Sequence, residues 1–92
     1  MSGGNSVYKI VFSPKAIRQL KSLERQVRER IKVAIERNLR VFPPQGDVLK
    51  LEYADNRFRL RVGDWRVTFR YRFENQEVHI AEVVHRSKAY RR

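Results

Sequence analysis

Arginine is concentrated in one short stretch, from Arg57 to Arg72, where basic and apolar residues alternate on both sides of a Gly-Asp pair. Guanidinium groups are planar, stay charged, and bind phosphate or carboxylate oxygens through paired N–H donors. The period of two predicts two half-buried strands, and Gly63-Asp64 between them predicts a two-residue hairpin turn. One face of this hairpin would be built from arginine, which indicates an anion as its ligand.

The turn also predicts which residues oppose each other. On the apolar side the pairs are Val62 with Trp65, Leu60 with Val67 and Phe58 with Phe69, and on the basic side Arg61 with Arg66, Arg59 with Thr68 and Arg57 with Arg70. Trp65 is assigned to the core because its parity places it with the apolar set. Like charges directly opposite each other destabilise a sheet, so a face of this kind favours an anionic partner.

Length and charge limit the possible functions. The 92 residues predict a single domain over residues 7–92, preceded by a flexible leader over residues 1–6. A net charge of +11 indicates a polyanionic partner such as RNA, DNA, the ribosome or an acidic protein, with a merely solubilising surface as the alternative. The chain lacks cysteine, which excludes disulfides and is compatible with a cytoplasmic protein. No apolar run approaches the roughly 18 residues of a membrane span, and no membrane partner is expected.

Periodicity predicts the remaining elements. A strand over Val7–Phe12 precedes a helix over Pro14–Leu23 that is capped by Ser13, and a second helix covers Glu24–Val41. A short strand over Val48–Leu51, the hairpin, and a last strand over Val78–Val84 follow, with a turn at Ala54-Asp55-Asn56. Glu82 breaks the alternation of the last strand, which a β-bulge would explain. The order predicts an α+β fold: an N-terminal strand, two helices, then a mainly antiparallel twisted sheet of three to four strands.

Two motifs carry a resemblance to a known family. Arg59–Val67 is similar to an R-x-R-x-G-D-Y-R-V-like run, and Val84–Tyr90 is similar to a V-x-H-R-x-x-x-Y ending. Together, over about residues 7–91, they resemble the RelE/ParE superfamily of bacterial and archaeal toxins. The resemblance implies a RelE-like fold and a cognate antitoxin partner. In the RelE branch it implies a ribosome-dependent endoribonuclease that cuts mRNA, and the toxin–antitoxin complex would also contact operator DNA.

Metal-free cleavage of RNA suits an arginine site. The ribose 2′-hydroxyl attacks the adjacent phosphate, and the enzyme aligns it, stabilises the charge on the phosphate and moves two protons. Arg59, Arg61 and Arg66 would form the catalytic phosphate clamp, with Arg66 matching the family's catalytic arginine, while Arg57 and Arg70 would bind the substrate. No metal-ligand spacing or phosphate-binding glycine loop is present in the sequence. The expected activity therefore needs no metal and no cofactor.

The proton carriers are assigned mainly from the resemblance. Some family members use lysines where this chain has Arg57 and Arg59, and an arginine is a poor general base because its pKa exceeds about 12. His85 is the predicted substitute, since imidazole titrates near neutral pH; a structural or exposed histidine is the alternative. Tyr90 would stack on a base or donate a proton, or would pack the tail onto the sheet. Arg86 would contact the phosphate, or is a terminal charge; His79 is left outside the predicted site.

Three functions remain open from the sequence. The first is an endoribonuclease toxin whose basic second helix docks on ribosomal RNA. The second is a ParE-like inhibitor of DNA gyrase without nuclease activity. The third is a non-catalytic RNA-binding module, which the missing lysines keep in consideration.

Overall fold

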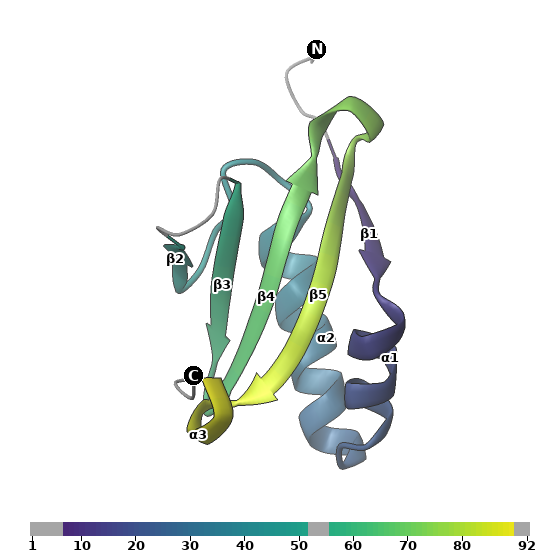
Figure 1. Cartoon of the computed structure of the whole chain (residues 1–92), viewed down its shortest axis with the longest axis vertical. Helices are drawn as coiled ribbons and strands as arrows, with labels where there is room; N and C mark the ends of the chain where they lie inside the picture. The colour runs from purple at the N-terminus through teal and green to yellow at the C-terminus, as the bar shows by residue number, and fades with distance from the viewer. Residues whose placement is uncertain (1–6, 52–55, 90–92) are drawn as a thin grey trace.

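The computed structural model describes residues 7–51 and 56–89, and it confirms the predicted α+β class (Figure 1). Its elements are β1 (Lys9–Phe12), α1 (Pro14–Lys21), α2 (Arg25–Leu39), β2 (Val48–Lys50), β3 (Arg57–Val62), β4 (Trp65–Arg72), the 3-10 turn η1 (Phe73–Asn75), β5 (Glu77–His85) and α3 (Arg86–Ala89). The predicted leader, and Ala54 and Asp55 of the predicted turn, lie outside the described residues.

The strands form one sheet with the order β1-β5-β4-β3-β2. β1 runs parallel to β5 and every other neighbouring pair is antiparallel, so the sheet is mainly antiparallel, as predicted. The hairpin has the predicted register, from Val62 opposite Trp65 to Arg57 opposite Arg70. Gly63 has a φ of +58°, which a residue with a side chain rarely adopts, and this explains the glycine in the turn.

β5 carries the predicted bulge. Thr68 pairs with Glu82 but Phe69 pairs with Ile80, so Ala81 has no partner residue on β4. Helix α1 supports this irregular segment from its side. The Ser13 hydroxyl donates to the Ala81 carbonyl at 2.8 Å, and the Gln19 side-chain oxygen accepts from the Val83 amide at 2.6 Å. The bulge therefore lets Val78, Ile80 and Val83 all point into the core despite the broken alternation.

The helices are shorter than predicted. Ser13 caps α1 as expected, and its hydroxyl accepts from the Ala16 amide at 3.0 Å. The helix ends at Lys21 rather than Leu23, and the amide of the C-cap Ser22 bonds back to the carbonyls of Arg18 and Gln19. α2 begins at Arg25 and ends at Leu39, inside the predicted Glu24–Val41. The helical turn α3 was not predicted, since four residues carry no readable helical period.

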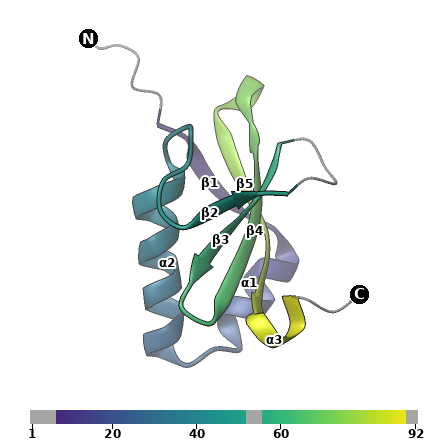
Figure 2. The ribbon, with the colours of Figure 1, turned by 90° about the vertical axis from the view of Figure 1, so that its left-hand side faces the viewer.

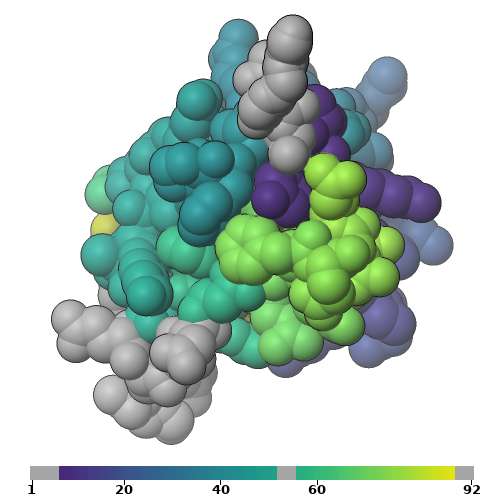
Figure 3. Space-filling model, turned by 90° about the horizontal axis from the view of Figure 1, so that it is seen from above, coloured from purple at the N-terminus to yellow at the C-terminus, as the bar shows by residue number. Residues whose placement is uncertain are grey.

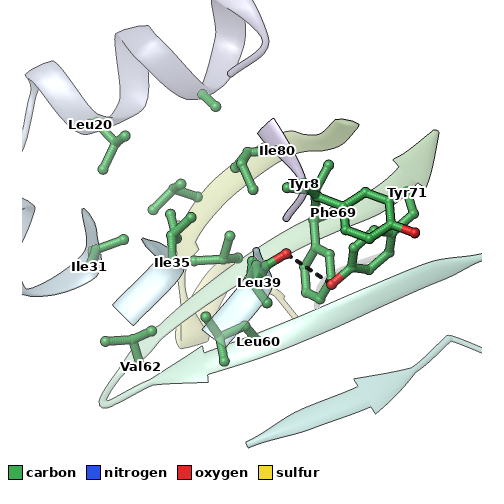
Figure 4. Close-up of a cluster of buried hydrophobic side chains, with 14 residues drawn as sticks. Tyr8, Leu20, Ile31, Ile35, Leu39, Leu60, Val62, Phe69, Tyr71 and Ile80 are labelled. Carbon is green, nitrogen blue, oxygen red and sulfur yellow. Dashed lines mark hydrogen bonds between the residues drawn. The ribbon is translucent and has the colours of Figure 1, made fainter. Parts of the chain in front are cut away.

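The core lies between the sheet and the two long helices. In Figure 2, α2 runs along one side of the sheet, and α3 lies on the other side. Figure 4 shows Leu20, Ile31 and Ile35 from the helices meeting Leu60, Phe69 and Ile80 from the strands, and all six are buried. The Tyr71 hydroxyl reaches across to donate to the carbonyls of Leu39 at 3.0 Å and Val41 at 2.7 Å. These bonds hold the C-terminal end of α2 against the sheet.

Aromatic side chains close the end of the core remote from the hairpin turn. The Phe42 ring lies 4.9 Å from that of Phe73 and 5.0 Å from that of Tyr71, both edge-on. Figure 3 looks onto this end, where the start of β1, the loop after α2 and the segment around η1 lie side by side. Among the described residues, no helix is long and apolar enough to cross a membrane.

Candidate functional site

Six arginines share the face of the sheet that α2 does not cover. Strand alternation places Arg57, Arg59 and Arg61 of β3 on that face, and the register adds Arg66, Arg70 and Arg72 of β4. The opposite parity of the same strands carries the buried Leu60, Val62, Val67 and Phe69. We call this surface the arginine face. Its composition matches the site predicted from the hairpin.

Arg66 differs from its neighbours because it is buried, with 3% of its surface exposed. One of its terminal nitrogens donates to the carbonyls of Gly63 at 3.0 Å and Trp65 at 3.1 Å, so the hairpin turn itself fixes the guanidinium. Its Nε–H is buried without a hydrogen-bond partner within the described residues, and the same holds for the Nε–H of Arg59. Arg59 lies diagonally across from Arg66 on the next strand, at a Cβ separation of about 7–8 Å or less.

An unpaired buried donor costs about 1–3 kcal/mol, and more when it belongs to a charged group. Both donors belong to cationic groups on adjacent strands, so the chemistry of this part of the arginine face suits a negatively charged acceptor. Phosphate oxygens have this chemistry.

Arg61 completes the row opposite Arg66 and is more accessible. Its Nε lies 3.9 Å from a carboxylate oxygen of Asp47, with 54% of the arginine side chain exposed. An exposed pair at this distance contributes little to stability. The Arg61 guanidinium is therefore accessible from solvent and only weakly held by Asp47.

The C-terminal segment reaches the same end of the arginine face. The Arg86 amide donates to the Asp64 carbonyl at 2.7 Å, which ties the start of α3 to the turn that precedes Arg66. Arg86 thus lies beside the predicted clamp, and its side chain is exposed. Tyr90, the other predicted residue of this segment, lies outside the described residues.

His85 does not lie where a general base for this site would be needed. It is the cross-strand partner of Trp65, on the opposite face of the sheet from Arg66, and its ring meets the Trp65 ring edge-on with centroids 5.2 Å apart. Its Nδ1 accepts from the Ser87 amide at 3.2 Å, so in the neutral ring the proton is on Nε2. In this position His85 caps α3. The bulge at Ala81 sets the parity that turns His85 away from the arginines.

The structure adds one residue that sequence reasoning omitted. His79 is the cross-strand partner of Arg70, so it extends the row Arg57–Arg70 onto a third strand. Its ring nitrogen Nε2 lies 2.8 Å from a carboxylate oxygen of Glu77. The alternation of Val78 and Ile80 already indicated an outward His79, but only the pairing of β4 with β5 shows its neighbour. Within the described part of the chain, no three His, Asp or Glu side chains are grouped as metal ligands.

Comparison with known proteins identifies the class of protein that carries this fold and site. Residues 10–90 match the family described as the ParE toxin of the type II toxin–antitoxin system parDE. The chain therefore belongs to this toxin family, within the RelE/ParE superfamily. No curated protein sequence matches the chain.

Solved structures agree with this assignment. The RelBE2 toxin–antitoxin complex of Mycobacterium tuberculosis contains a chain that is 28% identical with a TM-score of 0.69, over 88% of this chain and 93% of that one. The RelB–RelE complex of Methanococcus jannaschii matches with 25% identity and a TM-score of 0.68, over 87% and 94%. The isolated RelE toxin of E. coli shares the fold at 19% identity, with a TM-score of 0.67 over 85% and 83%.

Proposed function

We propose that this toxin is a metal-independent endoribonuclease that cuts mRNA on the ribosome, with the arginine face as its active site. The observation that carries the proposal is the pair of buried, unpartnered guanidinium N–H groups of Arg59 and Arg66. A scissile phosphate would supply the missing acceptors. It would gain most from them in the transition state, when its oxygens carry the most charge.

The residues divide into three roles in this mechanism. Arg66, fixed by the hairpin carbonyls, is the rigid donor to the phosphate, and Arg59 and Arg61 complete the clamp from β3. Arg70, four residues beyond Arg66, and Arg57, two residues before Arg59, bind the RNA beyond the cut. Arg86 contacts the phosphate from α3, and Tyr90 stacks on a base or donates the proton to the leaving oxygen. His85, predicted as the general base, instead positions α3 through its contact with Ser87. The proton of the attacking 2′-hydroxyl then passes to solvent water.

Cleavage in an active translation extract tests this function. Purified toxin should produce new mRNA ends only while the message is being translated, and Arg66→Ala should reduce the rate by about 10²–10³-fold. Arg72→Ala is the matched control: Arg72 lies on the same strand but is ion-paired with Glu74 at 3.3 Å, away from the clamp. Intact mRNA with the wild-type protein, or equal cleavage by Arg66→Ala, would overturn the proposal.

Inhibition of DNA gyrase is the second candidate, and the match to the ParE toxin family favours it. In this alternative the arginine face binds protein or DNA and breaks no bond. The replacement of lysines by Arg57 and Arg59 would then be harmless, because no proton transfer is required. A supercoiling assay with purified gyrase separates the two functions, since a nuclease that needs translating ribosomes leaves supercoiling unchanged. Salt-sensitive RNA binding, with neither mRNA cleavage nor gyrase inhibition, would indicate the third function, a non-catalytic RNA-binding module.

A cognate antitoxin is the proposed partner in all of these cases. The similar chains from Methanococcus jannaschii and Mycobacterium tuberculosis were solved in toxin–antitoxin complexes. A net charge of +11 suits an acidic partner segment that covers the arginine face and blocks phosphate binding. Contact with operator DNA would follow through the complex.

A further inference from the structure

A pocket of about 430 Å³ opens on the arginine face at the β5 bulge, away from the Arg66 clamp. Its lining includes Val11 and Phe12 of β1, Arg57, Arg70, His79 and the bulged Ala81. The volume is within the ordinary range of small-ligand sites, which is about 300–1,000 Å³. We call it the bulge pocket.

Three basic groups meet along one side of the bulge pocket. Arg57, Arg70 and His79 are successive cross-strand partners on β3, β4 and β5, so their side chains form a row on one face. Neither arginine has an ion-pair partner among the described residues. The carboxylate of Glu77 can only accept, so Nε2 of His79 is the donor in this contact.

The opposite side of the pocket is apolar. Val11 is the parallel-strand partner of His79 and shares its face, and Pro14 and Ala81 continue the lining. A small inorganic anion would use only the arginines, and an acidic side chain would use little of the wall. A nucleotide uses both, because its base is a flat apolar surface with polar edges and its phosphate matches paired guanidinium groups.

The spacing separates this pocket from the clamp. Arg70 is four residues beyond Arg66 on β4, which is about 13 Å along the strand, whereas Arg57 is two residues from Arg59 on β3. A phosphate on Arg66 and a phosphate on Arg70 are therefore different phosphates. A single strand of RNA lying along the arginine face would reach both.

We propose that the bulge pocket binds one nucleotide of single-stranded RNA, distinct from the nucleotides that flank the cut. Its phosphate lies on Arg57 and Arg70, and its base lies against the apolar lining that Val11, Pro14 and Ala81 provide. RNA as the ligand rests on the proposed function, whereas the occupancy of the pocket can be measured without any cleavage.

The test uses a short single-stranded RNA with 2′-O-methyl riboses, which cannot undergo attack by the 2′-oxygen. Binding is followed by fluorescence anisotropy at several salt concentrations. Arg57→Ala and Arg70→Ala should each weaken binding about tenfold and lower the salt slope by about 0.7. Arg72→Ala, one row beyond the pocket, should bind like the wild type. Val11→Glu, which places a negative charge in the apolar wall, should weaken binding at least as much as Arg70→Ala.

Amide NMR spectra of the ¹⁵N-labelled protein locate the ligand directly. Adenosine 5′-monophosphate should shift the amides of Val11, His79 and Ala81, and these shifts should disappear in Arg70→Ala. Equal RNA binding by Arg70→Ala and Arg72→Ala overturns the pocket. The pocket is also overturned as an RNA site if Arg70→Ala binds RNA like the wild type but loses affinity for the antitoxin. The pocket would then hold an antitoxin side chain.

The two proposals fail in different ways. If the wild type binds RNA through Arg70 but cuts no mRNA, the pocket stands and the nuclease function is wrong. If the wild type cuts mRNA and Arg70→Ala changes neither RNA binding nor KM, the nuclease stands and the pocket is wrong.

Discussion

Arg66 carries a positive charge and is buried. A substitution that removes the charge but keeps the volume can therefore separate its effect on activity from its effect on stability. Replacing it by methionine keeps much of the volume and removes both the charge and the unpartnered Nε–H. The lost bonds to Gly63 and Trp65 and the relief of the buried donor act in opposite directions. We expect Arg66→Met to change the free energy of unfolding by less than about 1 kcal/mol in urea titrations while abolishing mRNA cleavage. A large loss of stability would make Arg66 a structural residue.

Two roles compete for His85, namely proton transfer in catalysis and capping of α3, and one substitution separates them. Asparagine at this position can still accept from the Ser87 amide but does not titrate near neutral pH. If His85 only positions α3, and with it Arg86, His85→Asn should keep cleavage within about threefold of wild type, whereas His85→Ala should lose about tenfold. The pH profile of cleavage in extract decides the point. An acidic limb that disappears in His85→Asn together with the activity would restore the general-base role.

Tyr71 of β4 adds hydrogen bonds at the C-terminal end of α2, beside the buried contacts of Ile31, Ile35 and Leu39. Burial in the core, and secondarily the neighbouring Tyr8, raise the pKa of the Tyr71 hydroxyl above its ordinary value of 10.0. Because the folded pKa is the higher one, the unfolded chain ionises first. The stabilisation is therefore complete below about pH 10 and is lost as the pH rises toward the folded pKa.

Tyr71→Phe tests this anchoring by urea unfolding at pH 8 and pH 11. At pH 8 the variant should lose about 1–3 kcal/mol, because the carbonyls of Leu39 and Val41 lose their donor. Between the two pH values wild type should lose more stability than the variant. Tyr8→Phe is the control, since the Tyr8 hydroxyl makes no hydrogen bond within the described part of the chain. If Tyr71→Phe and Tyr8→Phe lose the same amount of stability between pH 8 and pH 11, the assignment of this pH dependence to Tyr71 is wrong.

The elements also show where sequence reasoning succeeds. The hairpin register followed from Gly63-Asp64, because a two-residue turn fixes every cross-strand pair by local geometry. The parallel pairing of β1 with β5 joins Lys9 to Glu77, and no local pattern encodes such a distant pairing. Separation along the sequence also limited the prediction of the site. The arginine face was readable from one hairpin, whereas the placement of His79 beside Arg70 and the turning away of His85 required the β4–β5 pairing and its bulge.

At the scale of the whole molecule, positive charge occupies two opposite sides. One is the arginine face, and the other is the outer surface of α2, where Arg25, Lys32 and Arg37 are exposed. No ion pair engages these three residues within the described ranges. A molecule of this size with cations on both sides can grip two nucleic-acid segments at once. In the proposed ribosome-dependent nuclease, one segment would be the substrate and the other would be ribosomal RNA.

Neutralising the α2 surface should therefore weaken docking without touching the chemistry. We expect Arg25→Gln/Lys32→Gln/Arg37→Gln to raise KM for cleavage on ribosomes about tenfold with kcat unchanged, and to lower the salt slope by about 0.9 for each phosphate that the variant no longer neutralises. The matched control, Lys9→Gln/Arg18→Gln/Lys21→Gln, removes the same charge from exposed positions on β1 and α1. Steady-state cleavage at several salt concentrations compares them. A specific docking surface requires the α2 variant to raise KM more than the control variant does. If both triple variants raise KM equally, α2 contributes only to the overall electrostatic field of the protein.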